Sequence, residues 1–492
     1  MPGEDELIQV RREKLDRLRA GGIDPYPARA KRTHTAANAI EAFERWESAG
    51  GTGEPPVVSV TGRITAMRDM GKAAFADLRD GTGRVQAFLR KNTLGESFER
   101  LADLDLGDFI GVTGPLMRTR AGEISVEALS IEVLTKALRP PPEKWHGIED
   151  VEIRYRQRYL DLMANDEARE IFRTRAAVVA AMRRFLDDRG FIEVETPVLQ
   201  AEAGGAAATP FVTHHRALDQ NFFLRISLEL HLKRLIIGGY DKVYEIGRIF
   251  RNEGVSWKYN PEFTMLESYE AYADYRDVAR MVEDMIASIA ERVLGSTTVQ
   301  FGEHQLDLKP PWARVTMRDA LIEHAGIDFD EFRTRDTMFD ELHRRGFELD
   351  PGWSWSKLLD EAVSHYVEPK LIQPTFLLDY PKEISPLAKS KPDAGNLVER
   401  FEVFAAGFEL GNAYSELNDP VDQRERFEVQ ARLQAAGLEE VETLDEDFLT
   451  ALEHGMPPTG GLGIGIDRLV MILTGNTSIR EVILFPQLRR RE

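Results

Sequence analysis

The chain has 492 residues, a net charge of -20 at pH 7 and no cysteine. This length exceeds one ordinary hydrophobic core, so we expect two or three domains. The absence of cysteine excludes disulfides, thiolate nucleophiles and zinc–thiolate sites. No apolar run approaches the roughly 20 residues that span a bilayer, and the N-terminus lacks the apolar stretch of a secretory signal. We therefore expect a cytoplasmic protein that does not enter a membrane.

The negative charge is unevenly distributed along the chain. Residues 1–150 carry 22 Lys and Arg against 24 Asp and Glu, so most of the acidic excess lies in residues 151–492. Overall acidity disfavours a polyanionic partner. A nearly neutral N-terminal third still permits a local basic patch that binds nucleic acid.

Two helices and a linker open the chain. Residues 5–20 have helical apolar spacing, and a second helix is expected to follow Thr35 and to run through Trp46. The glycine- and proline-rich stretch 50–56 is typical of a linker. Residues 1–50 are therefore expected to form an N-terminal helical extension.

Short alternating segments, separated by glycine-bearing turns, fill residues 57–133. The expected strands lie in VVSVTGRIT, AAFADLRD, RVQAFLR, DFIGVTGPLMRT and EISVEALSIEVL. Five such strands predict a small closed barrel, and the five-stranded oligonucleotide-binding (OB) fold is the leading candidate. A barrel with a purely structural role is the alternative. Because Pro140-Pro141-Pro142 marks the next boundary, we assign residues 51–145 to this domain.

The remaining residues, 146–492, mix amphipathic helices with β-rich runs. Helices are expected at about 166–189, 274–294, 315–325 and 421–437. Strands are expected in FIEVETPVLQ, FFLRISL, KVYEIGRIF, TMLESYEAYA, PTFLLDYP, GFELGNAYSEL and the C-terminal EVILF. The strands do not alternate regularly with helices, so an antiparallel sheet flanked by helices is favoured over a doubly wound one. The whole chain is expected to be of the α+β class.

Two motifs in this region carry chemistry. The first is Arg251-Asn252-Glu253-Gly254 with the following NPEFTMLE (260–267), and the second is GGLGIGIDR (460–468). Each contains an arginine, whose planar guanidinium suits anion recognition. The glycines of the second motif let the backbone approach a ligand closely. Together they predict a nucleotide site with a cationic co-substrate; an acidic turn and a glycine-rich helix start are the alternative.

These motifs resemble those of the class II aminoacyl-tRNA synthetases and, within that class, the lysyl-tRNA synthetases of bacterial type. Three further stretches carry the resemblance: GFIEVETP (190–197), RYRQRYLDL (154–162) and GNAYSELND (411–419). The resemblance implies that L-lysine is activated by ATP to lysyl-adenylate and transferred to the 3′ end of tRNA(Lys). It also implies a homodimer, because Pro197 occupies a position that lies at the dimer interface in this class.

The resemblance further implies which residues bind ATP. Arg251 is expected to hold the α-phosphate and the lysine carboxylate, and Arg468 the γ-phosphate, which makes these two the expected catalytic residues. Phe263 is expected to stack on adenine, and Glu253 to accept from its exocyclic amine. Asn260 completes this expected set.

Glu402 and Glu409 are implied as ligands of Mg²⁺, with Glu402 also contacting ATP. They lie seven residues apart in RFEVFAAGFEL, and on one continuous strand an odd spacing would place them on opposite sides. A bend or two paired strands would therefore be required to bring them to one ion. By spacing alone, both residues would be interpreted as solvated surface charges.

The substrate lysine is distinguished by ammonium groups, which must exchange water for anions and acceptors. Glu416 is implied as the acidic partner of the side-chain ammonium, with Asn412 and Tyr414 shortly before it. The resemblance extends the lysine site to a further set of residues: Glu229, Arg251, Glu267 and Tyr269.

In the barrel, four residues match positions at which lysyl enzymes hold the anticodon: Arg68, Phe75, Gln86 and Glu123. An aromatic ring stacks on an unpaired base without selecting it. Hydrogen bonds from the polar members are expected to select uridines.

Four positions depart from the expected pattern: Thr209 in place of a cation, Tyr259 in place of histidine, and Ser268 and Glu270 in place of bulkier apolar residues. Three rival functions remain. An aspartyl- or asparaginyl-tRNA synthetase would need a basic side-chain pocket, which disagrees with Glu416. A ligase that attaches lysine to a protein would lack the barrel. A catalytically silent paralogue that binds tRNA would have lost a phosphate arginine or a metal carboxylate, and this chain retains them.

Overall fold

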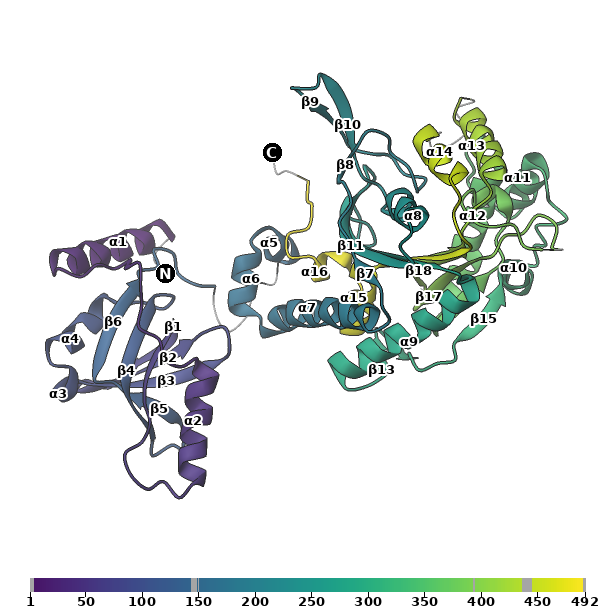
Figure 1. Cartoon of the computed structure of the whole chain (residues 1–492). Helices are drawn as coiled ribbons and strands as arrows, with labels where there is room; N and C mark the ends of the chain where they lie inside the picture. The colour runs from purple at the N-terminus through teal and green to yellow at the C-terminus, as the bar shows by residue number, and fades with distance from the viewer. Residues whose placement is uncertain (1–3, 143–147, 149, 393, 436–444, 490–492) are drawn as a thin grey trace. The chain divides into compact units, whose positions relative to one another are not determined.

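The computed structural model describes residues 4–142, 148, 150–392, 394–435 and 445–489. The chain divides into two compact units, residues 1–149 and 150–492, which are described separately (Figure 1). The expected boundary between residues 145 and 146 lies outside the described residues. In the part of the chain that is described, no helix combines the length and the apolar character that crossing a bilayer requires.

The first unit is a β-barrel accompanied by short helices (Figure 1). Its helices are α1 (Glu4–Ala20), α2 (Ala36–Ser48), α3 (Lys91–Leu94), α4 (Glu96–Glu99) and the 3-10 helix η1 (Arg100–Asp103). Its strands are β1 (Val57–Asp69), β2 (Ala73–Arg79), β3 (Arg84–Arg90), β4 (Phe109–Arg118), β5 (Ile124–Glu127) and β6 (Ser130–Thr135).

Five of these strands close into a ring, in the order β1-β2-β3-β5-β4 and back to β1. The predicted five-stranded OB barrel is therefore confirmed. The segment EISVEALSIEVL was predicted as one strand and is instead two, because β5 pairs with β3 and β4 whereas β6 pairs only with the first half of β4. Gly114 of β4 permits this change of partner, since a Cβ there would overlap the backbone oxygen of Glu127.

The barrel core forms from the inward residues of alternating strand positions, including Val58, Val60 and Ile64 of β1. Helix α2 covers part of it with Ala39 and Phe43, which are buried in the same cluster. The predicted start of this helix is confirmed, because the Thr35 side chain accepts a hydrogen bond from Asn38 N as an N-cap.

The second unit contains a large sheet, a small sheet and a hairpin. Its helices are α5 (Val151–Arg156), α6 (Arg158–Ala164), α7 (Asp166–Asp187), α8 (Glu229–Ile237), α9 (Tyr275–Leu294), α10 (Met317–Ala325), α11 (Arg335–Arg344), α12 (Trp355–Tyr366), α13 (Pro420–Ala435), α14 (Glu446–Glu453), α15 (Ile466–Thr474) and α16 (Ile479–Val482), with the 3-10 helices η2 (Glu368–Lys370) and η3 (Lys382–Ile384).

The strands of this unit are β7 (Ile192–Glu193), β8 (Leu199–Gln200), β9 (Val212–His215), β10 (Gln220–Leu224), β11 (Lys242–Phe250), β12 (Glu262–Ala271), β13 (Thr298–Phe301), β14 (His304–Asp307), β15 (Ala313–Thr316), β16 (Thr375–Leu378), β17 (Arg400–Ala405), β18 (Phe408–Ser415) and β19 (Thr459–Gly465). Eight of them form the large sheet, in the order β15-β16-β17-β18-β19-β12-β11-β7. The six central strands are antiparallel, as predicted, and the outer pairs β15–β16 and β11–β7 are parallel, so the sheet is mixed.

Helices α7, α9 and α15 lie along one face of this sheet (Figure 1). Apolar residues of the strands, such as Leu266, Leu462 and Ile464, face these helices in the main core. Their neighbours along the chain face the other side, because side chains alternate along a strand. That opposite face is the floor of the pocket described below.

The four predicted helices correspond to α7, α9, α10 and α13, although residues 436 and 437 of the last prediction lie outside the described residues. The prediction of a C-terminal strand in EVILF is wrong. Residues Ile479–Val482 form the short helix α16, whose Ile479 and Val482 pack into the main core. A short apolar run does not distinguish a buried strand from a buried helix turn by periodicity alone, which explains the error.

Candidate functional site

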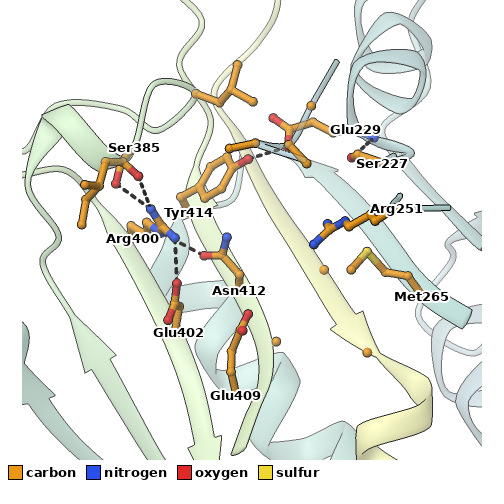
Figure 2. Close-up of a pocket in the computed structure, with 18 of the residues that line it drawn as sticks. Ser227, Glu229, Arg251, Met265, Ser385, Arg400, Glu402, Glu409, Asn412 and Tyr414 are labelled. Atoms are coloured by element: carbon orange, nitrogen blue, oxygen red, sulfur yellow. Dashed lines mark hydrogen bonds and ion pairs between the residues drawn. The ribbon is translucent and has the colours of Figure 1, made fainter. Parts of the chain in front are cut away.

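A cavity of about 750 Å³ opens on the face of the large sheet that is opposite to α7, α9 and α15. All residues predicted for ATP, lysine or metal binding line it: Glu229, Arg251, Glu253, Asn260, Phe263, Glu267, Tyr269, Glu402, Glu409, Asn412, Tyr414, Glu416 and Arg468. They come from α8, the strands β12, β17 and β18, the start of α15 and adjoining loops. Figure 2 shows part of this wall, with Glu402, Asn412 and Tyr414 directed from β17 and β18 into the pocket.

Glu402 and Glu409 lie on the two strands of the β17–β18 hairpin. Glu402 pairs with Asn412, and the register shifts between Val403 and Phe404, so that Phe404 pairs with Glu409. The turn is made at Ala406 and Gly407, both with positive φ. Two paired strands with a bulge therefore satisfy the odd spacing, and both carboxylates line the same cavity (Figure 2).

These two carboxylates fit a divalent cation in chemistry but do not complete a site by themselves. Burial and the nearby Glu409 raise the pKa of Glu402 to about 7, although Arg400 opposes the shift. Such mutual repulsion is what a bound cation relieves. No group of three or more His, Asp or Glu side chains suited to a metal exists among the described residues, so phosphate oxygens would have to supply further ligands.

Arg400 was not predicted as a site residue, yet its hydrogen bonds join β17 and β18 to the segment that follows η3. Its guanidinium donates to Glu402 at 2.7 Å, to Asn412 Oδ1 at 3.1 Å and to Ser385 Oγ at 2.8 Å (Figure 2). A signal was present in the sequence, because Arg400 precedes Glu402 by two residues and so shares its strand face.

The nucleotide side of the pocket contains the expected arginines and aromatic ring. The guanidinium carbon of Arg251 lies 5.2 Å from the centre of the Phe263 ring, and Arg251 is surrounded by the carboxylates of Glu253, Glu267 and Glu409. Arg468 Nη1 donates to the backbone oxygen of Glu409 at 2.8 Å and approaches its carboxylate at 3.1 Å. Arg468 is thus paired with a predicted metal ligand.

Asn260 lines the cavity, but its side-chain amide is engaged within the protein. Its Nδ2 donates to the backbone oxygen of Glu262 at 2.5 Å, and its Oδ1 accepts from Gln487 N at 3.1 Å. The amide therefore anchors the start of β12 to the C-terminal segment, and an ATP contact would have to displace one of these bonds.

Three buried carboxylates, those of Glu229, Glu267 and Glu416, also line the cavity. Glu267 Oε1 accepts from Ser227 Oγ at 3.0 Å and Leu228 N at 2.9 Å, while its Oε2 accepts from Tyr269 OH at 2.9 Å. Burial, followed by the charge of Glu229, raises the pKa of Glu267 to about 7. A cluster of this kind favours the binding of cations.

The tyrosine hydroxyls of the lysine set hold two of these acids in place, Tyr269 bonding to Glu267 and Tyr414 to Glu229. Tyr414 OH donates to Glu229 Oε2 at 2.5 Å (Figure 2). Glu416 is 2% exposed, and its pKa is raised well above the ordinary value by burial even though Lys233 opposes the shift. Lys233 of α8 was missed by sequence reasoning; it follows Glu229 by four residues, a spacing at which oppositely charged side chains meet on a helix.

Two of the four positions that depart from the expected pattern, Tyr259 and Thr209, lie at the nucleotide side; Ser268 is buried in β12, and Glu270 pairs with Lys242. Tyr259 is half exposed, and its ring centre lies 5.7 Å from the guanidinium carbon of Arg468. The backbone oxygen of Thr209 accepts from Asn252 N at 2.7 Å, a contact that any residue at this position can make.

In the barrel, the predicted anticodon residues lie on one face of the sheet, where Gln86 is buried. Arg68, Phe75, Phe88 and Glu127 form one row across β1, β2, β3 and β5, because each pairs with the next in register. The rings of Phe75 and Phe88 stack at 4.7 Å with an angle of 18°.

A second row of this surface contains Asp77, Gln86 and Ser125. Gln86 Oε1 accepts from Ser125 Oγ at 3.0 Å, and Arg84 bridges Asp77 and Glu123 at 2.9 and 2.7 Å. The surface thus joins aromatic faces to arginines and polar groups, the combination that binds single-stranded nucleic acid. Phe88 and Arg84 were not predicted as site residues.

Comparison with known proteins agrees with both units. Residues 150–489 match the family described as tRNA synthetases class II (D, K and N), and residues 58–134 match the OB-fold nucleic acid binding domain. Proteins named lysine–tRNA ligase from Dehalococcoides mccartyi (strain 195), Roseiflexus castenholzii and Bacillus subtilis (strain 168) are 56%, 53% and 51% identical to the chain. Each alignment covers 99% of this chain and 98–99% of the relative.

A sheet of antiparallel central strands with an arginine- and carboxylate-lined pocket, preceded by an OB barrel, defines a class II aminoacyl-tRNA synthetase. Within this class the chain belongs to the lysine–tRNA ligase family. It is accordingly an enzyme, and its function is the ligation of lysine to tRNA.

Proposed function

We propose that the cavity on the large sheet binds L-lysine and ATP side by side, forms lysyl-adenylate and passes the lysyl group to the 3′ end of tRNA(Lys). The observation that carries this proposal is that three buried carboxylates line the same cavity as Arg251, which lies beside Phe263. A zwitterionic amino acid with an additional ammonium group has the complementary charges.

In the lysine site, Glu416 takes the side-chain ammonium, and Glu229 and Glu267 take the α-ammonium end with support from Tyr269. Asn412 and Tyr414 complete the lining. Arg251 holds the substrate carboxylate. A neutral analogue would leave buried carboxylates unpaired, and such a site discriminates strongly against it.

In the ATP site, Phe263 stacks on adenine, Glu253 accepts from its exocyclic amine, and Asn260 completes the set; all three residues line the cavity. Arg251 holds the α-phosphate, and Arg468 leaves Glu409 to hold the γ-phosphate. Glu402 and Glu409 would hold Mg²⁺, which would neutralise phosphate charge when bound.

The reaction needs positioning and charge neutralisation rather than covalent help from the protein. A carboxylate oxygen of the substrate lysine attacks the α-phosphorus of ATP. The bond between the α-phosphorus and the oxygen that bridges it to the β-phosphorus breaks, and pyrophosphate leaves. Arg251 contacts both reacting groups and orients them. In the second step a ribose hydroxyl of the tRNA attacks the lysyl carbonyl carbon, and AMP leaves.

The barrel surface holds the anticodon. Phe75 offers a face for a base, and Arg68, Gln86 and Glu123 lie beside it as donors and acceptors. Support comes from the match of this unit to nucleic-acid-binding OB domains.

A second copy of the chain is the proposed partner of the edge strand β7 and the segment that follows it. Ile192, Val198 and Leu199 are 48%, 39% and 45% exposed, and Pro197 lies exposed between them. Several apolar side chains in one short stretch mark an interaction surface. A homodimer in the cytoplasm is consistent with the family.

ATP–pyrophosphate exchange with each standard amino acid, in the presence of Mg²⁺, tests the proposal. We expect exchange with lysine alone. Exchange with aspartate or asparagine would refute the role of Glu416, and no exchange with any amino acid would favour a silent tRNA-binding protein. Light scattering of the eluted protein, compared with a Leu199→Glu variant, tests the dimer: a monomeric parent protein would refute it.

A further inference from the structure

Lys233 places an ammonium group of the protein inside the carboxylate cluster of the pocket. Its side chain is fully buried, with Nζ 2.5 Å from Glu229 Oε1 and in an ion pair with Glu416 Oε2. Burial alone would lower the pKa of Lys233, but the attraction of Glu229 and Glu416 outweighs it and raises the pKa. Lys233 is therefore charged when the pocket is empty.

The formal charges of the cluster match the substrate only when Lys233 is counted. When ionised, the three carboxylates of Glu229, Glu267 and Glu416 carry a charge of −3. The ammonium group of Lys233 brings the net charge of the cluster to −2. L-Lysine brings two ammonium groups to this cluster, while its carboxylate balances Arg251. A buried charge without a partner is costly, so a pocket without Lys233 would hold one carboxylate too many.

The ion pairs also determine which carboxylate oxygens remain for a substrate. Both oxygens of Glu229 are used, one by Lys233 and one by Tyr414 OH, and both oxygens of Glu267 accept bonds from the protein. Glu416 Oε2 meets Lys233, whereas Glu416 Oε1 has no hydrogen-bond donor among the described residues. The pairing with Lys233 leaves this one buried oxygen available.

We propose that Lys233 is a resident counter-ion that favours the ionised form of the pocket carboxylates and fixes Glu416 with Oε1 free, so that the pocket accepts an amino acid with two ammonium groups. Lys233 is a positioning residue in this role, since it acts through Glu229 and Glu416. The inference rests on the proposed assignment of the three glutamates to the lysine site.

The charged and titratable groups around Lys233 come from four elements. They are Glu229, His231 and Arg234 of α8, Glu267 and Tyr269 of β12, Tyr414 and Glu416 at the end of β18, and Asp445, which pairs with Arg234 before α14. Arg234 is already paired with Asp445 at 3.0 Å, and burial lowers the pKa of His231. Neither group can replace the charge of Lys233 between the two glutamates.

Lysine-dependent ATP–pyrophosphate exchange by Lys233→Met, measured between pH 6 and 9, tests the inference. Because a cation within about 4–6 Å lowers a carboxyl pKa by about one to three units, its loss raises the pKa values of the cluster. We expect the acidic limb of kcat/KM for lysine to move upward by about one pH unit or more, KM for lysine to rise about tenfold or more, and KM for ATP to stay within twofold.

Two further variants separate charge from packing. Lys233→Arg retains the charge and should leave the acidic limb at its original pH. Lys242→Met removes a lysine that is one-third exposed and is paired with Glu270 at 2.7 Å outside the pocket. This variant should change neither the pH of the acidic limb nor KM for lysine. An unchanged limb and an unchanged KM for lysine in Lys233→Met would overturn the inference.

If Lys233→Met does not fold, the test passes to the double variant Lys233→Met with Glu229→Gln, which removes one charge of each sign. We expect this variant to fold, because the uncompensated charge is gone; failure of both variants would show that Lys233 acts by packing and would overturn the inference. Absence of lysine-dependent exchange in the parent protein would instead refute the proposed function.

Discussion

Gly461 lies against the carboxylate of Glu416. A Cβ at Gly461 would overlap Glu416 Oε1 and would stand 2.8 Å from Cε1 of Tyr269. The glycine-rich motif GGLGIGIDR, which forms β19 and the start of α15, predicts a close approach of the backbone to a ligand. At this position it makes room for an acid of the lysine site instead.

A single methyl group added at Gly461 should therefore weaken lysine binding strongly. Gly461→Ala should raise KM for lysine in the exchange reaction by about 100-fold or more, because Glu416 must move and carry its free oxygen away. Gly463→Ala is the matched control, two residues along the same strand, since its Cβ would meet only ordinary contacts of 3.8–3.9 Å. Equal effects of the two variants would contradict the role assigned to Gly461.

Glu267 makes lysine binding depend on pH. Its pKa is raised to about 7 by burial and by Glu229, and a substrate ammonium favours the ionised carboxylate. Affinity for lysine should therefore increase as the pH rises through 7, until the substrate amines lose protons. KM for lysine measured from pH 6 to 8.5 checks this, and a KM that is flat across this range would contradict it.

The raised pKa of Glu267 also makes the stability of the folded protein depend on pH, but stability falls as the pH rises whereas affinity for lysine increases. The pKa of Glu267 is higher in the folded protein than its ordinary value of 4.5, so the empty folded pocket binds the proton more tightly than the unfolded chain. The contribution of Glu267 to stability is present at low pH and is lost as the pH rises toward 7. Glu267→Gln should raise the melting temperature at pH 8 more than at pH 5.5, while it weakens lysine binding.

Glu409 links the proposed metal to Arg468. Glu409→Gln removes one of the two carboxylates offered to Mg²⁺, and we expect the half-saturating Mg²⁺ concentration for exchange to rise about tenfold or more. Glu383→Gln is the control, because Glu383 is an exposed acid on the rim of the same cavity whose carboxylate accepts from Asn396. An unchanged Mg²⁺ dependence in Glu409→Gln would remove Glu409 from the metal site.

Much of this architecture could be predicted from the sequence, because strand alternation and short motifs depend only on residues that are close along the chain. Period-two alternation predicted the barrel, and the motifs predicted pocket residues such as Arg251 and Glu416, all of which line one cavity. Contacts made across the fold were not predictable. Lys233 gains its importance from Glu416, which lies 183 residues further along the chain, and the pairing of Glu402 with Glu409 depends on a bulge.

A substitution at Phe75 tests whether the barrel serves tRNA binding independently of lysine activation. Its ring stacks on Phe88 at 4.7 Å on the outer barrel surface and is half-buried, so that it presents part of its face to a base. Base stacking contributes about 1–3 kcal/mol, which corresponds to a change of about 5- to 150-fold in an equilibrium constant. Phe75→Ala should raise KM for tRNA in the charging reaction within this range and leave lysine activation within twofold of the parent value.

The matched control for Phe75 is Phe109→Ala, because Phe109 is also half-buried in the barrel but packs against Arg63 at 4.3 Å, away from the row of Phe75 and Phe88. If only Phe75→Ala impairs charging, the anticodon lies on the predicted surface. Equal loss in charging and in lysine activation would show that Phe75 supports the fold of the enzyme rather than tRNA recognition. Equal losses of charging in both variants would place the tRNA contact elsewhere on the barrel.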